Sequence, residues 1–263
     1  QPGRLLLLVQ DKTGYLNLSE LLARGWVGNV QRNQAWLKWE WLAERGAGLL
    51  AISGADMGTV GQALLAGETE RAAAFARQLD QLFPGRFYIE LQRAQLPTNE
   101  AHVRAAVALA AKLKLPVVAT HPVEFLERDD FDAHEARVCI AEGETLANPR
   151  RVRRFTPEQY FKTQAQMEAL FADVPSAIAN TVEIARRCNL TLVLGKPQLP
   201  DFPTPLVDGA RIPIDTYFRQ ASHEGLEKRL EALFPDAAKR EENRARYVER
   251  LDFELATIIK MGF

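Results

Sequence analysis

Residues 116–140 read PVVATHPVEFLERDDFDAHEARVCI, an apolar run that leads through a polar turn into a helical pattern. The run at 116–120 predicts a short buried strand. Parallel β/α proteins place their working groups at the carboxyl ends of strands, and His121 and Glu124 follow this strand directly. An acidic loop then leads to His134 in the predicted helix. This is the densest group of candidate metal ligands and proton carriers in the sequence.

The same pattern of strand and helix extends toward the amino terminus. Further apolar runs predict strands at residues 5–9, 49–53 and 87–92. Helical spacing of leucines and alanines separates these runs, so strand and helix alternate from residue 5 to about 140. That alternation predicts an α/β fold in which helices surround a parallel sheet or barrel. Because a buried strand begins at Leu5, we expect the sequence to start inside a domain.

The pattern changes after residue 140. A short strand is expected at 190–194. Residues 195–213 contain five prolines and predict an extended linker. The other segments have helical spacing, at about 164–172, 175–188, 214–234 and 236–261.

The composition is that of an ordinary soluble globular protein, with 47% hydrophobic and 25% charged residues. The formal net charge of −1 lacks the basic excess of a duplex-binding domain, so any nucleic-acid surface must be local. Cys139 and Cys188 lie far apart in helical patterns, which predicts reduced core residues rather than a disulfide or a zinc pair. Without a membrane span or a signal peptide, we expect a cytoplasmic protein.

The four histidines form neither an H-x-H nor a D-x-H motif, the patterns that let neighbouring side chains of a strand end share a metal. Two interpretations remain for His121, Glu124 and His134. They hold one metal ion between them, or His134 packs at a helix start and His121 lies in a degenerate pocket. We favour the second, because charged loops are usually only solvated. His102 is expected at the surface.

Two further clusters also have two interpretations each. Trp36, Trp39 and Trp41 lie in a predicted helix, with the first two on one face, and indicate core packing or a base-stacking platform. A basic loop indicates contact with a phosphate backbone or a protein partner, or pairing with acidic helices. Its four arginines are Arg150, Arg151, Arg153 and Arg154.

Several segments resemble the alpha subunits of bacterial DNA polymerase III, the C-family replicative polymerases. The resemblance covers essentially the whole chain in order, which is more specific than any single motif. The segments are TGYLNL (13–18), FYIELQR (87–93), LPVVATHPVEFL (115–126), FDAHEARVCIAEGETL (131–146), ANTVEIARRCNL (179–190), QLPDFPTP (198–205) and IIKMGF (258–263).

The resemblance implies a domain organisation. Residues 1–195 are expected to form a PHP (polymerase and histidinol phosphatase) domain, a distorted β/α barrel truncated at its amino terminus so that the first metal motifs are missing. Residues 196–213 would be the proline-rich linker, and 214–263 a helical segment that leads into the palm. The open edges of a truncated barrel would favour swapping or dimerisation.

The resemblance also implies that the metal-ligand positions of this domain are degenerate. Metal-binding PHP domains carry a histidine where this chain has Ala94, and a D-x-H where it has Pro122-Val123-Glu124. We therefore expect a metal-free domain. The alternative is a metal-dependent phosphoesterase with proofreading or pyrophosphatase activity.

The resemblance implies a role in DNA replication. The parent protein would be a DNA-directed DNA polymerase, a nucleotidyltransferase that uses Mg²⁺ and binds DNA. Its catalytic aspartates would lie beyond residue 263, so these residues alone are expected to be inactive. In the family the PHP domain helps to dock the proofreading exonuclease subunit, and we expect that partner and other replisome subunits here.

Overall fold

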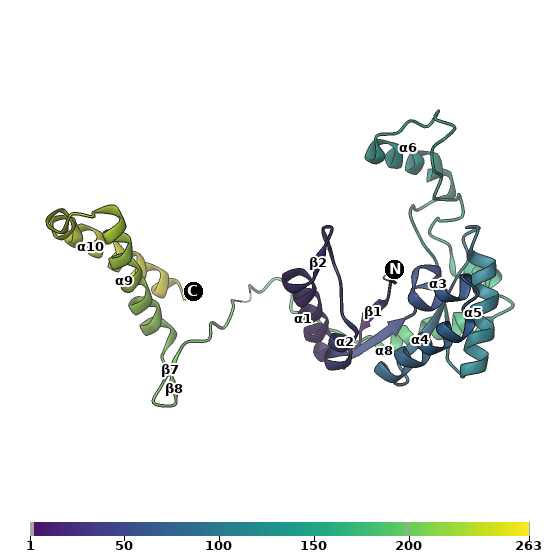
Figure 1. Cartoon of the computed structure of the whole chain (residues 1–263), viewed down its shortest axis with the longest axis horizontal. Helices are drawn as coiled ribbons and strands as arrows, with labels where there is room; N and C mark the ends of the chain where they lie inside the picture. Colours follow the sequence, from purple (N-terminus) through teal and green to yellow (C-terminus); the bar gives the residue numbers. More distant parts are fainter. Residues whose placement is uncertain (1–2, 198, 263) are drawn as a thin grey trace. The chain divides into compact units, whose positions relative to one another are not determined.

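The computed structural model of the chain describes residues 3–197 and 199–262. The chain divides into two compact units, Gln1–Leu192 and Val193–Phe263. The first unit contains the sheet and most of the helices (Figure 1). Within the described ranges, no helix is long and apolar enough to cross a membrane.

The first unit is built on a four-stranded sheet of order β1-β4-β5-β6. Its strands are β1 (Leu6–Val9), β4 (Leu49–Ile52), β5 (Phe87–Gln92) and β6 (Val117–Thr120). Strands β4, β5 and β6 are parallel, which confirms the predicted α/β class. The sheet is open in the part of the chain that the structure describes, with β1 and β6 at its two edges.

Strand β1 departs from the expected parallel arrangement, because it pairs with β4 in the antiparallel sense. A single return helix between neighbouring strands would make them parallel. Here several elements intervene, so the chain enters β4 from the opposite end. They are α1 (Lys12–Gly28), a hairpin of β2 (Val30–Gln31) and β3 (Gln34–Ala35), and α2 (Trp39–Arg45).

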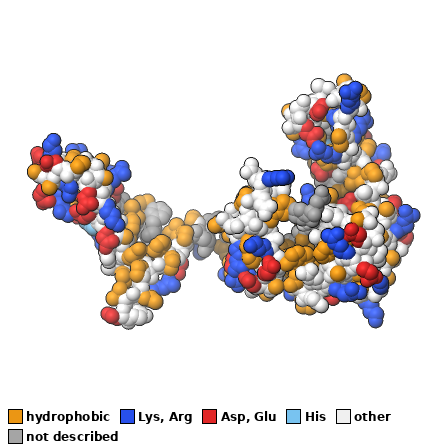
Figure 2. Space-filling model, viewed as in Figure 1, with side chains coloured by type: hydrophobic (Ala, Val, Ile, Leu, Met, Phe, Trp, Pro, Cys, Tyr) orange, Lys and Arg blue, Asp and Glu red, His pale blue; other side chains and the backbone are white. Residues whose placement is uncertain are grey.

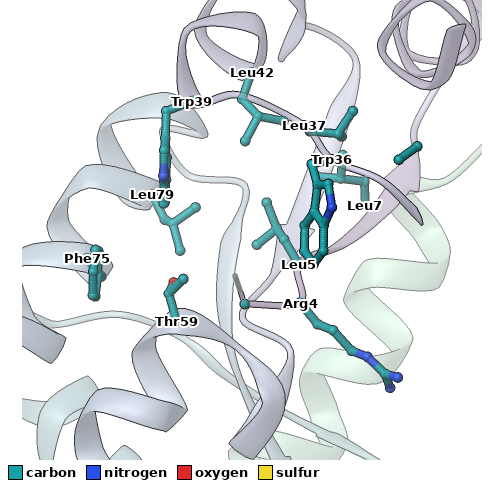
Figure 3. Close-up of a pocket in the computed structure, with 12 residues that line it drawn as sticks. Arg4, Leu5, Leu7, Trp36, Leu37, Trp39, Leu42, Thr59, Phe75 and Leu79 are labelled. Carbon is teal, nitrogen blue, oxygen red and sulfur yellow. The ribbon is translucent and has the colours of Figure 1, made fainter. Parts of the chain in front are cut away.

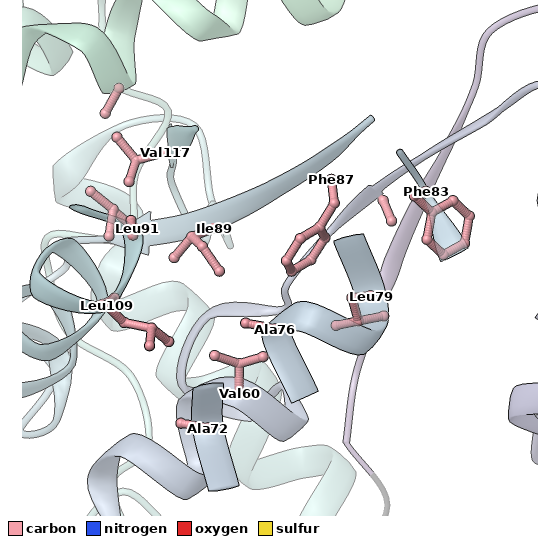
Figure 4. Packing of buried hydrophobic residues seen from close by; sticks show 14 of the residues in the cluster. Val60, Ala72, Ala76, Leu79, Phe83, Phe87, Ile89, Leu91, Leu109 and Val117 are labelled. Atoms are coloured by element: carbon pink, nitrogen blue, oxygen red, sulfur yellow. The ribbon is translucent and has the colours of Figure 1, made fainter. Parts of the chain in front are cut away.

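Helices pack on both faces of this sheet. Successive side chains of a strand point to opposite faces, so Leu49 and Ala51 enter one core and Leu50 and Ile52 enter another. The larger core packs the sheet against several helices (Figure 4), among them α3 (Thr59–Leu65), α4 (Thr69–Leu82) and α5 (Asn99–Leu113). Ile184 of α8 (Pro175–Arg187) covers the other face. Two further short helices of this unit are η1 (Ala55–Met57) and α7 (Gln164–Leu170).

An arm formed by residues 121–161 projects from the end of β6 (Figure 1). Its two chain segments meet where Phe125 bridges Tyr160. Beyond that bridge lie η2 (Arg128–Asp130) and α6 (Phe131–Glu142). Acidic and basic side chains are mixed over the surface of the α6 region (Figure 2).

The second unit consists of a short hairpin and two long helices. The predicted helices are found as α9 (Ile214–Leu233) and α10 (Ala237–Met261). The segment predicted as an extended linker contains a hairpin, because β7 (Leu206–Val207) and β8 (Ala210–Arg211) pair within it. The predicted strand at 190–194 is also wrong: these residues form no strand, since no neighbouring backbone pairs with them. Residue 198 of the predicted linker lies outside the described ranges.

Two predictions for side chains in the first unit are wrong. Trp36 follows β3 rather than lying in a helix, so it shares no helical face with Trp39. Trp39 itself packs as expected of a core residue, with its ring stacked on Phe75 at a centroid distance of 6.4 Å. His102 is only 2% exposed, not on the surface, because its side of α5 turns toward the core.

The start of α1 packs so closely on the turn before β4 that Gly14 has no room for a side chain. A Cβ there would lie 1.9 Å from the carbonyl oxygen of Gly48. We predict that Gly14→Ala lowers the free energy of unfolding by about 1–3 kcal/mol, although alanine favours helices. Gly28 in the same helix has open space, so Gly28→Ala should change it by less than about 0.5 kcal/mol. Urea denaturation of both variants checks this, and equal effects would contradict the packing argument.

Candidate functional site

The carboxyl ends of β4, β5 and β6 meet at one edge of the sheet, where an α/β protein would place its reactive groups. Glu90 lies there, 4% exposed, and its Oε1 accepts hydrogen bonds from Thr120 Oγ1 at 2.5 Å and Gln92 Nε2 at 3.1 Å. The backbone N–H of Glu90 donates to Ser53 Oγ at 2.9 Å. The polar side chains at this edge therefore bind one another, one strand to the next.

The loop that follows β5 is closed by Asn99. Its side-chain Oδ1 accepts hydrogen bonds from the backbone N–H of Ala94 at 2.7 Å and of Leu96 at 3.3 Å. The carbonyl oxygen of Ala94 accepts from Thr156 Oγ1 at 2.5 Å. Ala94 is 1% exposed, so its methyl group is enclosed and its backbone groups are both bonded.

His121 is held by the base of the arm. Its Nε2–H donates to the carbonyl oxygen of Glu158 at 2.7 Å, while Nδ1 is buried without a hydrogen-bond partner in the described residues. Burial lowers the pKa of His121, and the backbone carbonyl of Glu158 opposes that shift. The nearby ammonium of Lys162 adds to the lowering of the pKa. His121 is thus a neutral imidazole that ties the sheet edge to residue 158.

Glu158, whose carbonyl binds His121, also forms ion pairs through its side chain. Its carboxylate contacts Lys162 Nζ at 2.8 Å and Arg128 Nη2 at 3.0 Å. The hydrogen bond from Lys162 is the main reason that the pKa of Glu158 is lowered. Lys162, whose side chain is 5% exposed, also lies over the ring of Tyr160 at 3.7 Å. This pairing neutralises the charge on both side chains near the sheet edge.

Pro122 and Glu124, the other two positions expected to be degenerate, lie in the outgoing segment of the arm, and their backbone groups bond to Gln159 of its returning segment. Gln159 donates from Nε2 to the carbonyl oxygen of Pro122 at 3.2 Å, and its own carbonyl accepts from the N–H of Glu124 at 2.8 Å. Gln159 is 3% exposed, whereas the Glu124 side chain is exposed. Glu124 therefore points away from the enclosed polar groups.

The residues present do not fit the metal that PHP domains can carry. Ala94 and Pro122 have no donor side chain, and Glu124 is exposed. Among residues 3–197 and 199–262, no group of three or more His, Cys, Asp or Glu side chains is placed to hold a metal ion. The structure does not bring His121, Glu124 and His134 together into such a group.

His134 has a different environment, inside the arm. Its ring lies 5.3 Å from that of Phe125 and 4.6 Å, edge-on, from that of Phe155. Arg137 Nη2 donates to His134 Nδ1 at 3.3 Å. His134 thus packs in an aromatic cluster at the helix start, as the structural interpretation predicted. Cys139 of the same helix is buried, and both cysteines are free thiols.

The four arginines of the basic loop differ in their burial and in their ion-pair partners. Arg151 forms a buried ion pair with Glu135 at 2.5 Å, each side chain being 4% exposed. Arg154 pairs with Glu142 at 3.0 Å near the surface. Arg150 and Arg153 are exposed and have no ion pair among the described residues. Half of the basic cluster therefore stabilises the arm, and contact with phosphate or a partner stays a proposal for the other two.

A small cavity of about 130 Å³ lies beside Ala94. Arg93 lines it and is held by Asp173 at 2.6 Å, by Glu100 at 3.1 Å and by the carbonyl of Leu170 at 2.7 Å. Because carboxylates balance both cations of its wall, Arg93 and Lys162, the cavity has no excess charge to attract an anion.

Sequence reasoning missed the residues that close this edge. Asn99, which bonds Ala94 and Leu96, and Gln159, which bonds Pro122, are each 3% exposed and were not among the predicted site residues. Glu90 lies in the predicted strand at 87–92 and was not predicted as a site residue. Its position in the strand could have identified it. Both faces of a parallel sheet are covered, so a polar side chain inside a central strand needs hydrogen-bond partners.

The partial burial of His121 should make the stability of the fold depend on pH. Its folded pKa lies below the ordinary value of 6.5, so the unfolded chain takes up the proton first as the pH falls. The contribution of neutral His121 to the free energy of unfolding is fully present above about pH 6.5. It is lost as the pH falls from there toward the folded pKa. We predict that His121→Asn makes the melting temperature less dependent on pH between about 7.5 and 5. An unchanged slope in calorimetry would contradict this placement of His121.

The arm should depend on its buried ion pair. We predict that Arg151→Ala raises the hydrogen-exchange rates of α6 amides at least about tenfold, because Glu135 is left buried without a partner. Arg154→Ala removes an exposed pair and serves as the matched control, with little expected effect. Equal exchange in both variants would contradict the assignment.

Comparison with known proteins gives two findings. Residues 1–94 match the family model described as "PHP domain". The DNA polymerase III alpha subunit of Pseudomonas aeruginosa is 49% identical over 262 residues, which are 99% of this chain and 22% of that protein. The alpha subunit of Neisseria meningitidis serogroup B is 49% identical over 267 residues, 100% of this chain and 23% of that protein.

The alpha subunit of Escherichia coli K12 is 42% identical over 259 residues, 98% of this chain and 22% of that protein. The chain thus spans less than a quarter of the length of these curated relatives. The match to PHP covers 1–94, and the extension of that domain to residue 195 stays a proposal. The chain carries a PHP domain match and is homologous, over nearly its entire length, to a region of the DNA polymerase III alpha subunits.

Proposed function

We propose that this chain serves DNA replication as the PHP region of a DNA polymerase III alpha subunit, and that its α/β unit is a metal-free scaffold rather than a catalytic domain. The observation that carries the proposal is the state of the carboxyl sheet edge. The positions that would hold metal are Ala94, Pro122 and Glu124, and the polar groups around them bond to one another. Apart from Nδ1 of His121, the polar groups named at this edge are already bonded, so the edge does not offer the several free donors that a metal ion needs.

The polymerase reaction itself would belong to the longer protein. The relatives are named for a DNA polymerase, and nucleotidyl transfer by polymerases uses Mg²⁺ held by carboxylates. We propose that those carboxylates and the contacts to DNA lie outside these residues. The α9–α10 hairpin would then connect the scaffold to the palm.

The partner that we propose for the scaffold is the proofreading exonuclease subunit, within a cytoplasmic assembly of replisome subunits. The arm supports a docking role, because it projects from the sheet and leaves apolar side chains in solvent. Ile140 of α6 is 83% exposed and Leu126 is 71% exposed. Exposed apolar side chains on a projecting element favour contact with another protein.

A metal-dependent phosphoesterase is the alternative, and the unpaired Nδ1 of His121 is the observation of the site that favours it. It would need donors that converge on one ion. His121 is instead hydrogen-bonded to residue 158, and His134 packs between phenylalanine rings.

Calorimetric titration with the cognate exonuclease subunit tests the proposal. We predict binding that changes by less than about twofold between EDTA and Mn²⁺, since a scaffold needs no metal. Ile140→Asp should weaken binding, whereas Asp132→Asn, another exposed position of α6, should not. Binding that requires Mn²⁺, or hydrolysis of a phosphodiester by the chain with Mn²⁺, would favour the phosphoesterase. Absence of binding would contradict the docking role.

A further inference from the structure

Two residue clusters of this chain were candidates for contact with a macromolecule. The tryptophans form no exposed stacking platform, because Trp36 and Trp39 are half-buried and line a cavity together with Phe75 (Figure 3). The basic loop is the other candidate, and the scaffold uses only half of it. Residues 145–154 of this loop contain four arginines and no acidic residue.

The course of the basic loop is fixed from within the arm. Arg151 anchors it, because the buried ion pair with Glu135 fastens the loop to α6. Before this anchor, Asn148 Oδ1 accepts a hydrogen bond from the N–H of Arg150 at 3.0 Å. After it, Phe155 packs into the aromatic cluster of the arm. The contacts inside the arm therefore determine which side chains of the loop face outward.

Three side chains next to the anchor face solvent. Val152 is 66% exposed. Arg150 and Arg153 are exposed and have no ion pair among the residues that the structure describes. An apolar side chain between two arginines is a combination that protein interfaces favour, since arginine contributes both its charge and its aliphatic part.

The acidic side chains near the loop have other partners. Glu142 pairs with Arg154 at 3.0 Å, and the carboxylate of Glu144 accepts a hydrogen bond from Asn148 Nδ2 at 2.8 Å. Two positive charges of the loop are therefore available to carboxylates from outside the arm.

The charge of the whole arm favours a protein segment over nucleic acid as the ligand. Residues 121–161 contain nine acidic residues and six arginines, so a long polyanion would meet an excess of negative charge beyond the loop. A short peptide segment can contact the loop alone. Its carboxylates would lie on the arginines, and an apolar side chain would lie on Val152.

We propose that the outward side chains of the basic loop, Arg150, Val152 and Arg153, bind an acidic segment of a protein partner in which carboxylate and apolar side chains alternate. The inference rests on the docking role proposed for the arm and adds the chemistry of the partner. The carboxylates accept charge-assisted hydrogen bonds from the two guanidinium groups. The apolar side chains cover Val152 and exclude water from around those bonds.

Fluorescence anisotropy with a labelled peptide of alternating aspartate and leucine tests the proposal, both on this chain and on the longer polymerase subunit. We expect the double variant Arg150→Gln, Arg153→Gln to weaken binding of the peptide at least about tenfold. The matched control is Arg77→Gln, Arg104→Gln, which removes two exposed arginines of α4 and α5 and changes the net charge equally. This control should change the affinity by less than about twofold.

Equal weakening by the two double variants would show unspecific attraction and overturn the proposal. Absence of binding to the longer subunit, or equal binding of a peptide of asparagine and leucine, would overturn it too. Tighter binding of a single-stranded oligonucleotide than of the acidic peptide, lost in Arg150→Gln, Arg153→Gln, would assign the loop to nucleic acid instead. If the exonuclease subunit binds the chain but the acidic peptide does not, this inference fails and the docking role stands.

Discussion

The side-chain oxygen of Asn99 accepts hydrogen bonds from the N–H groups of Ala94 and Leu96, and this contact sets the course of the chain at the end of β5. It turns the loop directly into α5, whose Val103, Ala106 and Leu109 fill the larger core. The same turn encloses Ala94 and aligns its carbonyl with the base of the arm. The sheet edge and the core helix therefore depend on one buried amide.

From this constraint the rest of the edge follows. The arm returns beside β6 and supplies Thr156, Glu158 and Gln159, each of which bonds a group at a strand end. Where a catalytic α/β protein leaves such groups free for a ligand, here they join parts of the fold. Separating hydrogen-bonded polar groups that are buried in this way costs free energy, so the contacts at this edge stabilise the fold. This is the physical basis for a scaffold.

Local patterns predicted most of the helices and the positions of all four sheet strands, whereas the strand expected at 190–194 did not form. Apolar spacing marks the residues that are buried. Burial does not depend on whether the partner segment is near or far in the sequence. The direction of β1 was not predictable, because it depends on how α1, α2 and the intervening hairpin pack. The β7–β8 hairpin was missed although Asp208-Gly209, both with positive φ, carries the usual turn signal. The five prolines around it pointed to a linker instead.

The contacts of the candidate site were not predictable from the sequence. That Ala94 and Pro122 stand at metal-ligand positions is what the family resemblance implies, and it stays a prediction. Which arginine of the basic loop is buried could not be read there, since Arg150 and Arg151 are adjacent and chemically identical. Only the return of the loop onto α6 separates them. Long-range contacts of this kind are set by packing rather than by local pattern.

Elemental analysis of the purified chain for zinc, manganese and iron tests the central claim most directly. The account predicts less than about a tenth of an equivalent of any metal, and no rise in melting temperature when metal is added, because a bound ion would stabilise the fold by linkage. A stoichiometric metal that is lost in His121→Ala or Glu124→Ala would contradict the account and make the sheet edge a catalytic centre.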